Sequence, residues 1–236
     1  MSLRRTIRFS PHPAALFVRR AYYLPEKVSL PTPRIIVRPL LVAFESVRAG
    51  THFLRRVFIA EPLFKAYCSD YGTGVRTGIF VHWIQGKGDI SLGDGVLFDG
   101  KCSIKFAARY SERPSLKVGS HSGIGHACSF TIGKAITIGN HCRIAQGVTM
   151  FDSPGHPLDP VARRNGNPAP FEDVRPISIG NNVWIGAHSI IFPGVTIGDN
   201  SVVAMGSSVM TNVPPNSFVS GNPARVLKAL ARGQHA

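Results

Sequence analysis

Large apolar residues recur at every sixth position through the middle and the C-terminal half of the chain. These residues are Leu92, Phe98, Ile104, Val118, Ile124, Phe130, Ile138, Ile144, Met150, Ile179, Ile185, Ile191, Ile197, Val203 and Val209. Four residues further along most of these hexads the side chain is small, as at Val96, Cys102 and Ser122. Units of this kind bury their apolar side only against their neighbours, so the pattern predicts a solenoid.

The hexads group in threes and give coils that start at residues 92, 118, 138, 179 and 197. Equivalent residues of successive coils would stack at the strand spacing of about 4.8 Å. The alternation of an ordinary β-sandwich has a period of two and does not hold a phase of six, so we expect a parallel β-helix. Glycines follow the first residue of four coils, at Gly93, Gly139, Gly180 and Gly198. We expect them at corners that need a positive φ.

A long loop interrupts the repeat. Between the coil starts at 138 and 179 lie 23 residues more than one coil needs, which predicts a protruding loop over residues 151–177. Loops on rigid scaffolds often carry function, and several prolines stiffen this one around His156. An imidazole titrates near neutral pH, so His156 is a candidate general base. Taken alone, however, a loop histidine is more often solvated than catalytic.

Composition adds a strongly basic N-terminal segment. The net charge is +14, and residues 1–66 carry twelve Lys and Arg against three acids. We therefore divide the chain into a basic, partly helical segment (1–75), the β-helix (76–214) and a C-terminal tail (215–236). Arginines interrupt every apolar run before it could span a membrane, and no signal peptide is evident, so we expect a cytoplasmic protein.

The N-terminal segment shows two patterns. Pro25, Pro31 and Pro33 suggest extended chain, whereas residues 39–50 have helical periodicity, and Thr51 could cap a second helix. The apolar side of these helices could plug the open end of the β-helix, which is the interpretation we favour. It could instead contact an anionic membrane at its inner face. We expect no nucleic-acid binding, because no recognised motif accompanies the charge.

The cysteines indicate packing. Cys102, Cys128 and Cys142 occupy the small inward position of their hexads, Cys68 is unassigned, and no CxxC pair is present. This usage is consistent with a reducing compartment, and we expect no bound metal.

Four motifs in order resemble a known family. They are Gly155–Pro160 (GHPLDP), Ile179–Gly186 (IGNNVWIG), Pro193–Asn200 (PGVTIGDN) and Gly221–Arg225 (GNPAR). Together they resemble the maltose and galactoside O-acetyltransferases of the hexapeptide-repeat family over roughly half of the chain. The resemblance implies a left-handed β-helix, a homotrimer with active sites between adjacent subunits, and acetyl-CoA as the donor. It also implies that His156 removes the proton from a sugar hydroxyl, which then attacks the thioester directly.

Other site residues follow from the same resemblance. Implied acceptor contacts are Asp159, His126 and Trp184. The family has an asparagine at the position of Gly125, and the neighbouring His126 is the candidate to replace it. Implied coenzyme A contacts are Trp184, Gly186, Ala187, Met205, Thr211, Arg225 and Lys228. At Ala187 the galactoside enzymes have a hydroxyl residue, so a donor to the oxyanion there would have to be the backbone N–H.

The predicted function is therefore acetyl-CoA-dependent O-acetylation of a sugar hydroxyl. The helical acceptor domain of the maltose and galactoside enzymes is missing, which favours a polysaccharide, a lipid-linked saccharide or a glycolipid as acceptor. One alternative is N-acetylation of an amino-sugar nucleotide, and another is a non-catalytic scaffold. A third is a zinc enzyme that resembles the gamma-class carbonic anhydrases, with His82, His121 and His126 as ligands and His141 stacked on His121.

Overall fold

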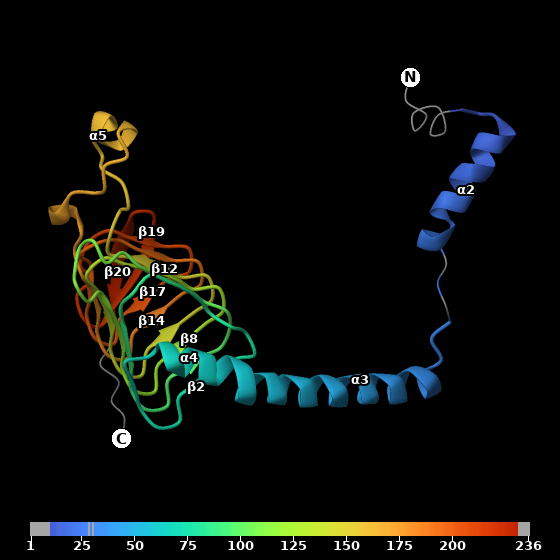
Figure 1. The fold of residues 1–236 in the computed structure, drawn as a ribbon, viewed down its shortest axis with the longest axis horizontal. Coiled ribbons are helices and arrows are strands. Elements are labelled where there is room, and N and C mark those ends of the chain that lie inside the picture. Colours follow the sequence, from blue (N-terminus) through green and yellow to red (C-terminus); the bar gives the residue numbers. More distant parts are fainter. Residues whose placement is uncertain (1–9, 28, 30, 231–236) are drawn as a thin grey trace. The chain divides into compact units, whose positions relative to one another are not determined.

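The computed structural model describes residues 10–27, 29 and 31–230. The chain divides into two compact units, one up to Ala49 and one from Gly50 onward. The first unit contains α2 (Pro13–Lys27) and most of α3 (Arg34–Arg55). Every other helix and strand described here belongs to the second unit, in which the strands wind into a coil (Figure 1).

The coil has three parallel sheets, one along each face. Sheet A contains β1 (Asp70–Tyr71), β4 (Asp89–Leu92), β7 (Ser115–Val118), β10 (Ala135–Ile138), β13 (Ile177–Ile179) and β16 (Thr196–Ile197). Sheet B contains β2 (Arg76–Thr77), β5 (Leu97–Phe98), β8 (Gly123–Ile124), β11 (Arg143–Ile144), β14 (Trp184–Ile185), β17 (Val202–Val203), β19 (Ser217–Gly221) and β20 (Ala224–Ala229). Sheet C contains β3 (Trp83–Gln85), β6 (Ser103–Phe106), β9 (Ser129–Ile132), β12 (Thr149–Phe151), β15 (Ile190–Ile191) and β18 (Ser208–Val209). Only β20 is antiparallel to its neighbour among these strands.

The strand register confirms the six-residue period. In sheet A, Leu92 pairs with Val118 and Val118 with Ile138, so first positions of successive coils stack directly. All fifteen large apolar residues of the repeat are buried and form one continuous core with the valines and cysteines at the fifth positions, and the serines at these positions are buried as well. The parallel β-helix predicted from the sequence is the fold of the second unit.

The corner after sheet A corrects our explanation of the glycines. Positive φ angles occur two residues later, as at His121, His141 and Asn182, while Gly139 has none. A Cβ on Gly139 would instead collide with the backbone of Gly180 in the next coil. These glycines are therefore needed for close stacking of coils.

The Asp or Asn that follows each of these glycines links the coils. Asn140 Oδ1 accepts a hydrogen bond from Ser120 N (2.8 Å), Asn181 Oδ1 from Asn140 N (2.9 Å), and Asp199 Oδ1 from Asn181 N (2.7 Å). Each side chain thus satisfies a corner N–H of the preceding coil that no strand neighbour can reach.

The N-terminal helices differ from the prediction. Pro25 lies inside α2 rather than in extended chain, because Ala and Leu residues before it favour a helix that ends two residues later. A single helix, α3, passes through Gly50 and Thr51 without the predicted break. Its apolar residues keep one phase on both sides of Gly50, which outweighs the cost of about 1 kcal/mol for a glycine.

The end of the core is covered by a short helix beyond α3. The chain continues from α3 into the π-helix η1 (Arg56–Ala60) and then into α4 (Glu61–Tyr67). Phe64 of α4 is buried in the core, with its ring centroid 4.9 Å from that of Phe98, whereas no residue of α3 is buried. Helix α4, and not the longer amphipathic helix, supplies the apolar contact that we expected of a plug.

The strands extend beyond the expected limits of the β-helix. β1 begins at Asp70, within the segment assigned to residues 1–75, and β19 continues sheet B parallel to β17 within the expected tail. No helix in the described part of the chain is long and apolar enough to cross a membrane.

Candidate active site

The long loop leaves the coil after β12 of sheet C and returns at β13 of sheet A. Its base is held by Asp152, a fully buried residue that the sequence analysis did not single out. The Asp152 carboxylate accepts hydrogen bonds from the N–H groups of Gly133 (2.5 Å), Lys134 (2.7 Å) and Ala135 (2.8 Å) in the preceding turn. Arg175 N, at the other end of the loop, donates to Asp152 O (2.9 Å). Both ends of the loop are thus tied to one residue.

Asp152 is unusual because it is a fully buried carboxylic acid at the base of a surface loop. Burial raises the pKa of its carboxyl group, while the three N–H donors act in the opposite direction. The signal in the sequence was an acid directly after the last strand residue of a coil, where the turn needs an acceptor.

His156 lies four residues beyond this anchor and is exposed. The chain after it is fixed by Arg163, whose Nη1 donates to Pro157 O (3.0 Å) and to Leu158 O (2.9 Å). Asp159 caps α5 (Pro160–Arg164) by accepting from Ala162 N (2.6 Å). Among the described residues no hydrogen bond holds the imidazole itself. The scaffold therefore fixes the loop backbone and leaves the ring open to a substrate.

A second group of predicted residues gathers on the corner between sheets B and C. Gly147 N donates to His126 O (2.8 Å), and two coils further on Gly206 N donates to Ala187 O (2.8 Å). Gly186 allows Met205 to stack closely, because a Cβ on Gly186 would collide with Met205 N. The predicted contacts His126, Gly186, Ala187 and Met205 thus form one column.

Trp184 stands beside this column. It lies on the outer face of β14, two residues before the corner, and 57% of its surface is exposed. An indole in this position presents a large flat apolar surface that a ligand or another protein copy can cover.

A third group lies at the C-terminal end of the coil. Thr211 and Arg225 line the same cavity of about 130 Å³, together with apolar residues of β18, β19 and β20. Lys228, on β20, lies over the ring of Phe218 at 5.7 Å. Arg225 and Lys228 are thus two exposed cations of β20, and side chains of this kind bind phosphate groups.

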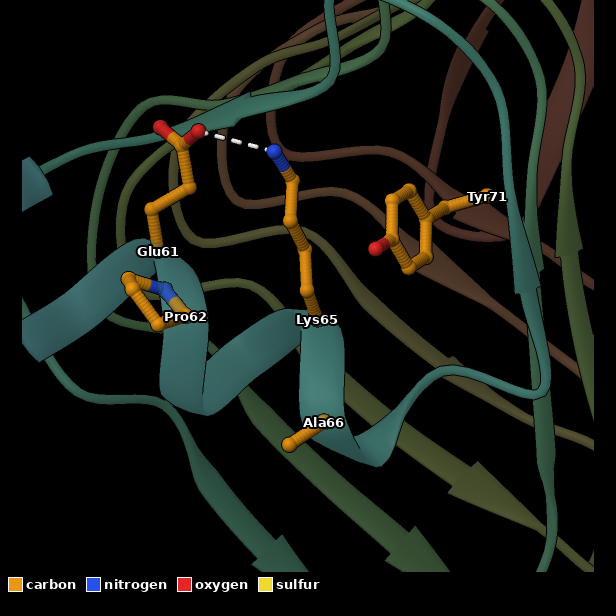
Figure 2. A pocket seen from close by; sticks show the side chains of 5 residues that line it. All are labelled: Glu61, Pro62, Lys65, Ala66 and Tyr71. Atoms are coloured by element: carbon orange, nitrogen blue, oxygen red, sulfur yellow. Dashed lines mark hydrogen bonds and ion pairs between the residues drawn. The ribbon is translucent and has the colours of Figure 1, made fainter.

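A larger cavity of about 410 Å³ lies between α4 and β1 and contains none of the predicted site residues (Figure 2). Its charged groups are paired, because Glu61 contacts Lys65 (2.8 Å) and Arg56 (3.5 Å), and Lys65 also lies 5.4 Å from the centre of the Tyr71 ring. These contacts fasten α4 to the first strand.

The histidines of the zinc alternative do not assemble. His82 is buried, and its Nδ1 accepts from Cys102 N (3.2 Å) between the rings of Phe64 and Phe98. His121 stacks on His141 at the exposed corner between sheets A and B, with ring centroids 5.2 Å apart. Within the described part of the chain, no group of three or more His, Cys, Asp or Glu is arranged to hold a metal ion.

The predicted residues therefore occupy three places in one copy of the chain. His156 and Asp159 belong to the loop at the corner between sheets C and A, the His126 column lies on another corner, and Thr211 and Arg225 lie at the C-terminal end.

Comparisons with known proteins match this fold. Residues 176–210 match the family model described as the hexapeptide repeat of succinyl-transferase. Galactoside O-acetyltransferase from Escherichia coli (strain K12) is 48% identical over 95 residues, which are 40% of this chain and 44% of that protein. The chain spans about half the length of the curated relatives that it matches.

Two solved structures extend the likeness. The N-acyltransferase AntD from Bacillus cereus, in complex with dTDP-4-amino-4,6-dideoxyglucose and coenzyme A, has a TM-score of 0.59 and 26% identity, covering 73% of this chain and 89% of that one. The hexapeptide-repeat acetyltransferase VCA0836 from Vibrio cholerae, complexed with acetyl-CoA, has a TM-score of 0.51 and 26% identity, covering 76% and 83%. The coil is thus a left-handed parallel β-helix. Residues 176–210 match a hexapeptide-repeat model, and the chain is similar to acetyltransferases that contain this repeat.

Proposed function

We propose that the protein transfers an acetyl group from acetyl-CoA to a hydroxyl group of a saccharide, with His156 as the general base. The observation that carries the proposal is the placement of His156 on a loop whose two ends are tied to the coil by Asp152. The 48% identity over 95 residues to a galactoside O-acetyltransferase supports a hydroxyl acceptor.

The proposed chemistry is a direct transfer. An imidazole nitrogen of His156 takes the proton of the sugar hydroxyl as its oxygen attacks the thioester carbonyl, and the tetrahedral intermediate then expels the coenzyme A thiolate, which receives the proton. The backbone N–H of Ala187 is available to stabilise the oxyanion, since no hydrogen bond to it is found in the described part of the chain. Trp184, Met205, Thr211, Arg225 and Lys228 would bind coenzyme A, while His126 and Asp159 would contact the acceptor.

We infer that the working unit is a homotrimer. The loop of one copy would lie against the corner column of the next, which would join the three separated groups of residues into one site. This arrangement also gives the exposed Trp184 and the apolar loop residues Leu158 and Phe171 surfaces to pack against.

For the acceptor we propose a polysaccharide, a lipid-linked saccharide or a glycolipid, held at the inner face of a membrane. The N-terminal third carries basic helices, α2 and α3, which suit an anionic surface. Transfer to the amine of an amino-sugar nucleotide is the second candidate, because AntD is named an N-acyltransferase and is similar over 73% of this chain. Mild alkali releases an ester acetate and leaves an amide, which separates the two.

The first experiment is a thermal-shift titration with acetyl-CoA on the wild type and on His156→Ala. Ligand at 100 times its Kd adds about 2.7 kcal/mol of stability. We expect both proteins to be stabilised, while His156→Ala loses roughly 10²–10⁴-fold in turnover.

A matched control is His141→Asn, which removes an exposed histidine on a different corner and keeps a residue that tolerates positive φ. It should retain wild-type turnover. The absence of any shift with acetyl-CoA would reject the donor, and unchanged turnover in His156→Ala would reject the base.

A further inference from the structure

Helix α3 has one continuous apolar side, and most of its charged residues lie on the opposite side, together with Leu41 and Val42. Ile36, Leu40, Ala43, Phe44, Val47 and Leu54 recur at spacings of three, four and seven residues and share one side of the helix. Arg34, Arg38, Glu45, Ala49 and His52 lie on the opposite side. This is the pattern of a helix that normally buries its apolar side.

That side is exposed along the helix in the described part of the chain. None of the 22 residues of α3 is buried, and 63% of the surface of Leu40 and 61% of that of Phe44 is exposed. A helix of 22 residues is about 33 Å long, so the exposed apolar strip is far longer than a single exposed side chain on an ordinary surface.

The charges indicate what covers it. Helix α3 contains four arginines and one acid, Glu45. Arg48 and Arg55 lie at the margin of the apolar side, where long basic side chains can reach lipid phosphates while their stems lie on the acyl chains. A protein partner would need an acidic residue opposite each of these arginines. An anionic bilayer supplies negative charge along the whole strip.

We propose that α3 lies in the plane of an anionic membrane, with the side that contains Leu40, Phe44 and Val47 among the acyl chains and Arg48 and Arg55 at the phosphates. This rests on the membrane location proposed above and adds the element and the face that make the contact. The contact would keep the coil close to acceptors that are themselves anchored in the bilayer.

The test is co-sedimentation of the full chain with phosphatidylcholine vesicles, with and without phosphatidylglycerol. The first variant carries Leu40→Glu and Phe44→Glu on the apolar side. Its matched control carries Ala49→Glu and His52→Glu on the opposite side, so the two proteins have equal net charge with neutral histidine. We expect wild type to bind the anionic vesicles, the apolar-side variant to lose about tenfold or more in affinity, and the control to stay much closer to wild type. Raising the salt from 0.1 M to 1 M, which shortens the Debye length from about 10 to about 3 Å, should weaken binding.

Equal losses in the two variants, or no binding of wild type to anionic vesicles, would overturn the proposal. A change of oligomeric state in the apolar-side variant, with no vesicle binding by wild type, would identify the strip as an interface between copies instead. Acetyl transfer to a soluble acceptor is measured on the same proteins. If a variant no longer binds vesicles but still acetylates the soluble acceptor at the wild-type rate, the proposed enzymatic function stands. If wild type binds vesicles but acetylates no acceptor, the membrane contact stands and the proposed enzymatic function fails.

Discussion

At the scale of single residues, His82 is a histidine kept neutral by its surroundings. Its ring lies 4.4 Å from that of Phe64 and 5.4 Å from that of Phe98, between centroids. Because Nδ1 accepts from Cys102 N, the ring proton is on Nε2, and that buried N–H has no partner among the described residues. Burial lowers the pKa of His82 from 6.5 to about 4.

This predicts a stability that depends on pH. Between pH 4 and 6.5 the unfolded chain binds the His82 proton and the folded chain does not, so the free energy of unfolding rises with pH across that window. The stability that the neutral, buried His82 contributes is fully present above pH 6.5, the pKa of the unfolded state, and is lost as the pH falls towards 4. It is on the order of 3 kcal/mol. Urea unfolding at a fixed protein concentration should show this slope in wild type.

In His82→Gln, which keeps an acceptor and cannot titrate, the rise in the free energy of unfolding between pH 4 and 6.5 should be smaller by about 3 kcal/mol. The exposed His121→Asn is the control and should keep the wild-type slope. An unchanged slope in His82→Gln would show that other groups cause the pH dependence.

The residue scale is also where the sequence alone was least informative. The hexads predicted which side chains are buried, because burial follows directly from period six. They did not predict that Asp152 would be buried, since an acid after a strand is usually solvated and only the three N–H groups of the preceding turn explain it. The role that we propose for His156 follows from the motif around it, because the hexads carry no information about a loop that leaves the coil.

At the scale of elements, the corner glycines couple each coil to the next. A side chain at Gly139 would meet the Gly180 carbonyl and the Asn181 side chain, and neither can move without opening the ladder of hydrogen bonds between coils. Gly50, inside α3, has no heavy atom near the position of a Cβ. The same substitution should therefore have opposite effects at the two positions.

We expect Gly139→Ala to destabilise the protein by about 1–3 kcal/mol, as other overpacking changes do. Gly50→Ala should cost nothing and should raise the helicity of α3, because alanine is favoured by about 0.5–1 kcal/mol within a helix. Thermal unfolding followed by circular dichroism measures both effects. If Gly139→Ala is as stable as wild type, the corner can accommodate a Cβ and the close contact with Gly180 is not a constraint on the sequence.

The boundaries of the N-terminal helices were predicted less well than the helices themselves. The apolar period of residues 40–58 correctly indicated a helix, but glycine and proline positions gave the wrong boundaries because local signals are weaker than a sustained apolar phase. The π-helix η1 had no visible signal in the sequence. It adds a residue to the turn, changes the phase of the helix, and precedes the point where Phe64 enters the core.

At the scale of the whole molecule, the fold was predictable and the complete site was not. A solenoid contacts mainly its sequence neighbours, so its architecture can be read from a one-dimensional repeat. The candidate site residues are distributed over two corners and one end of the coil, and in the trimer that we propose the distances between these groups depend on how copies assemble. No periodicity in a single chain encodes that assembly.

The proposed trimer makes a prediction at this scale. Subunits with His156→Ala should be mixed, by co-expression, with subunits that carry Gly186→Val in the corner column. If the loop of one copy completes the corner of another, the mixture regains about a quarter of wild-type activity, because one interface in four joins an intact loop to an intact corner. Each parent alone should be inactive. A mixture as inactive as its parents would place the whole site within one subunit.

The hairpin of β19 and β20 affects the tendency of the coil to aggregate with other copies of the chain. A stack of parallel coils has no built-in length, and an open end offers unpaired strand edges to any similar chain. Here β20, which is antiparallel to β19, is the end strand of sheet B, while α4 covers the other end of the core. Loss of β20 by proteolysis would expose the edge of β19, so we expect the truncated coil to pair with strands of other copies and to form fibres more readily than the intact one.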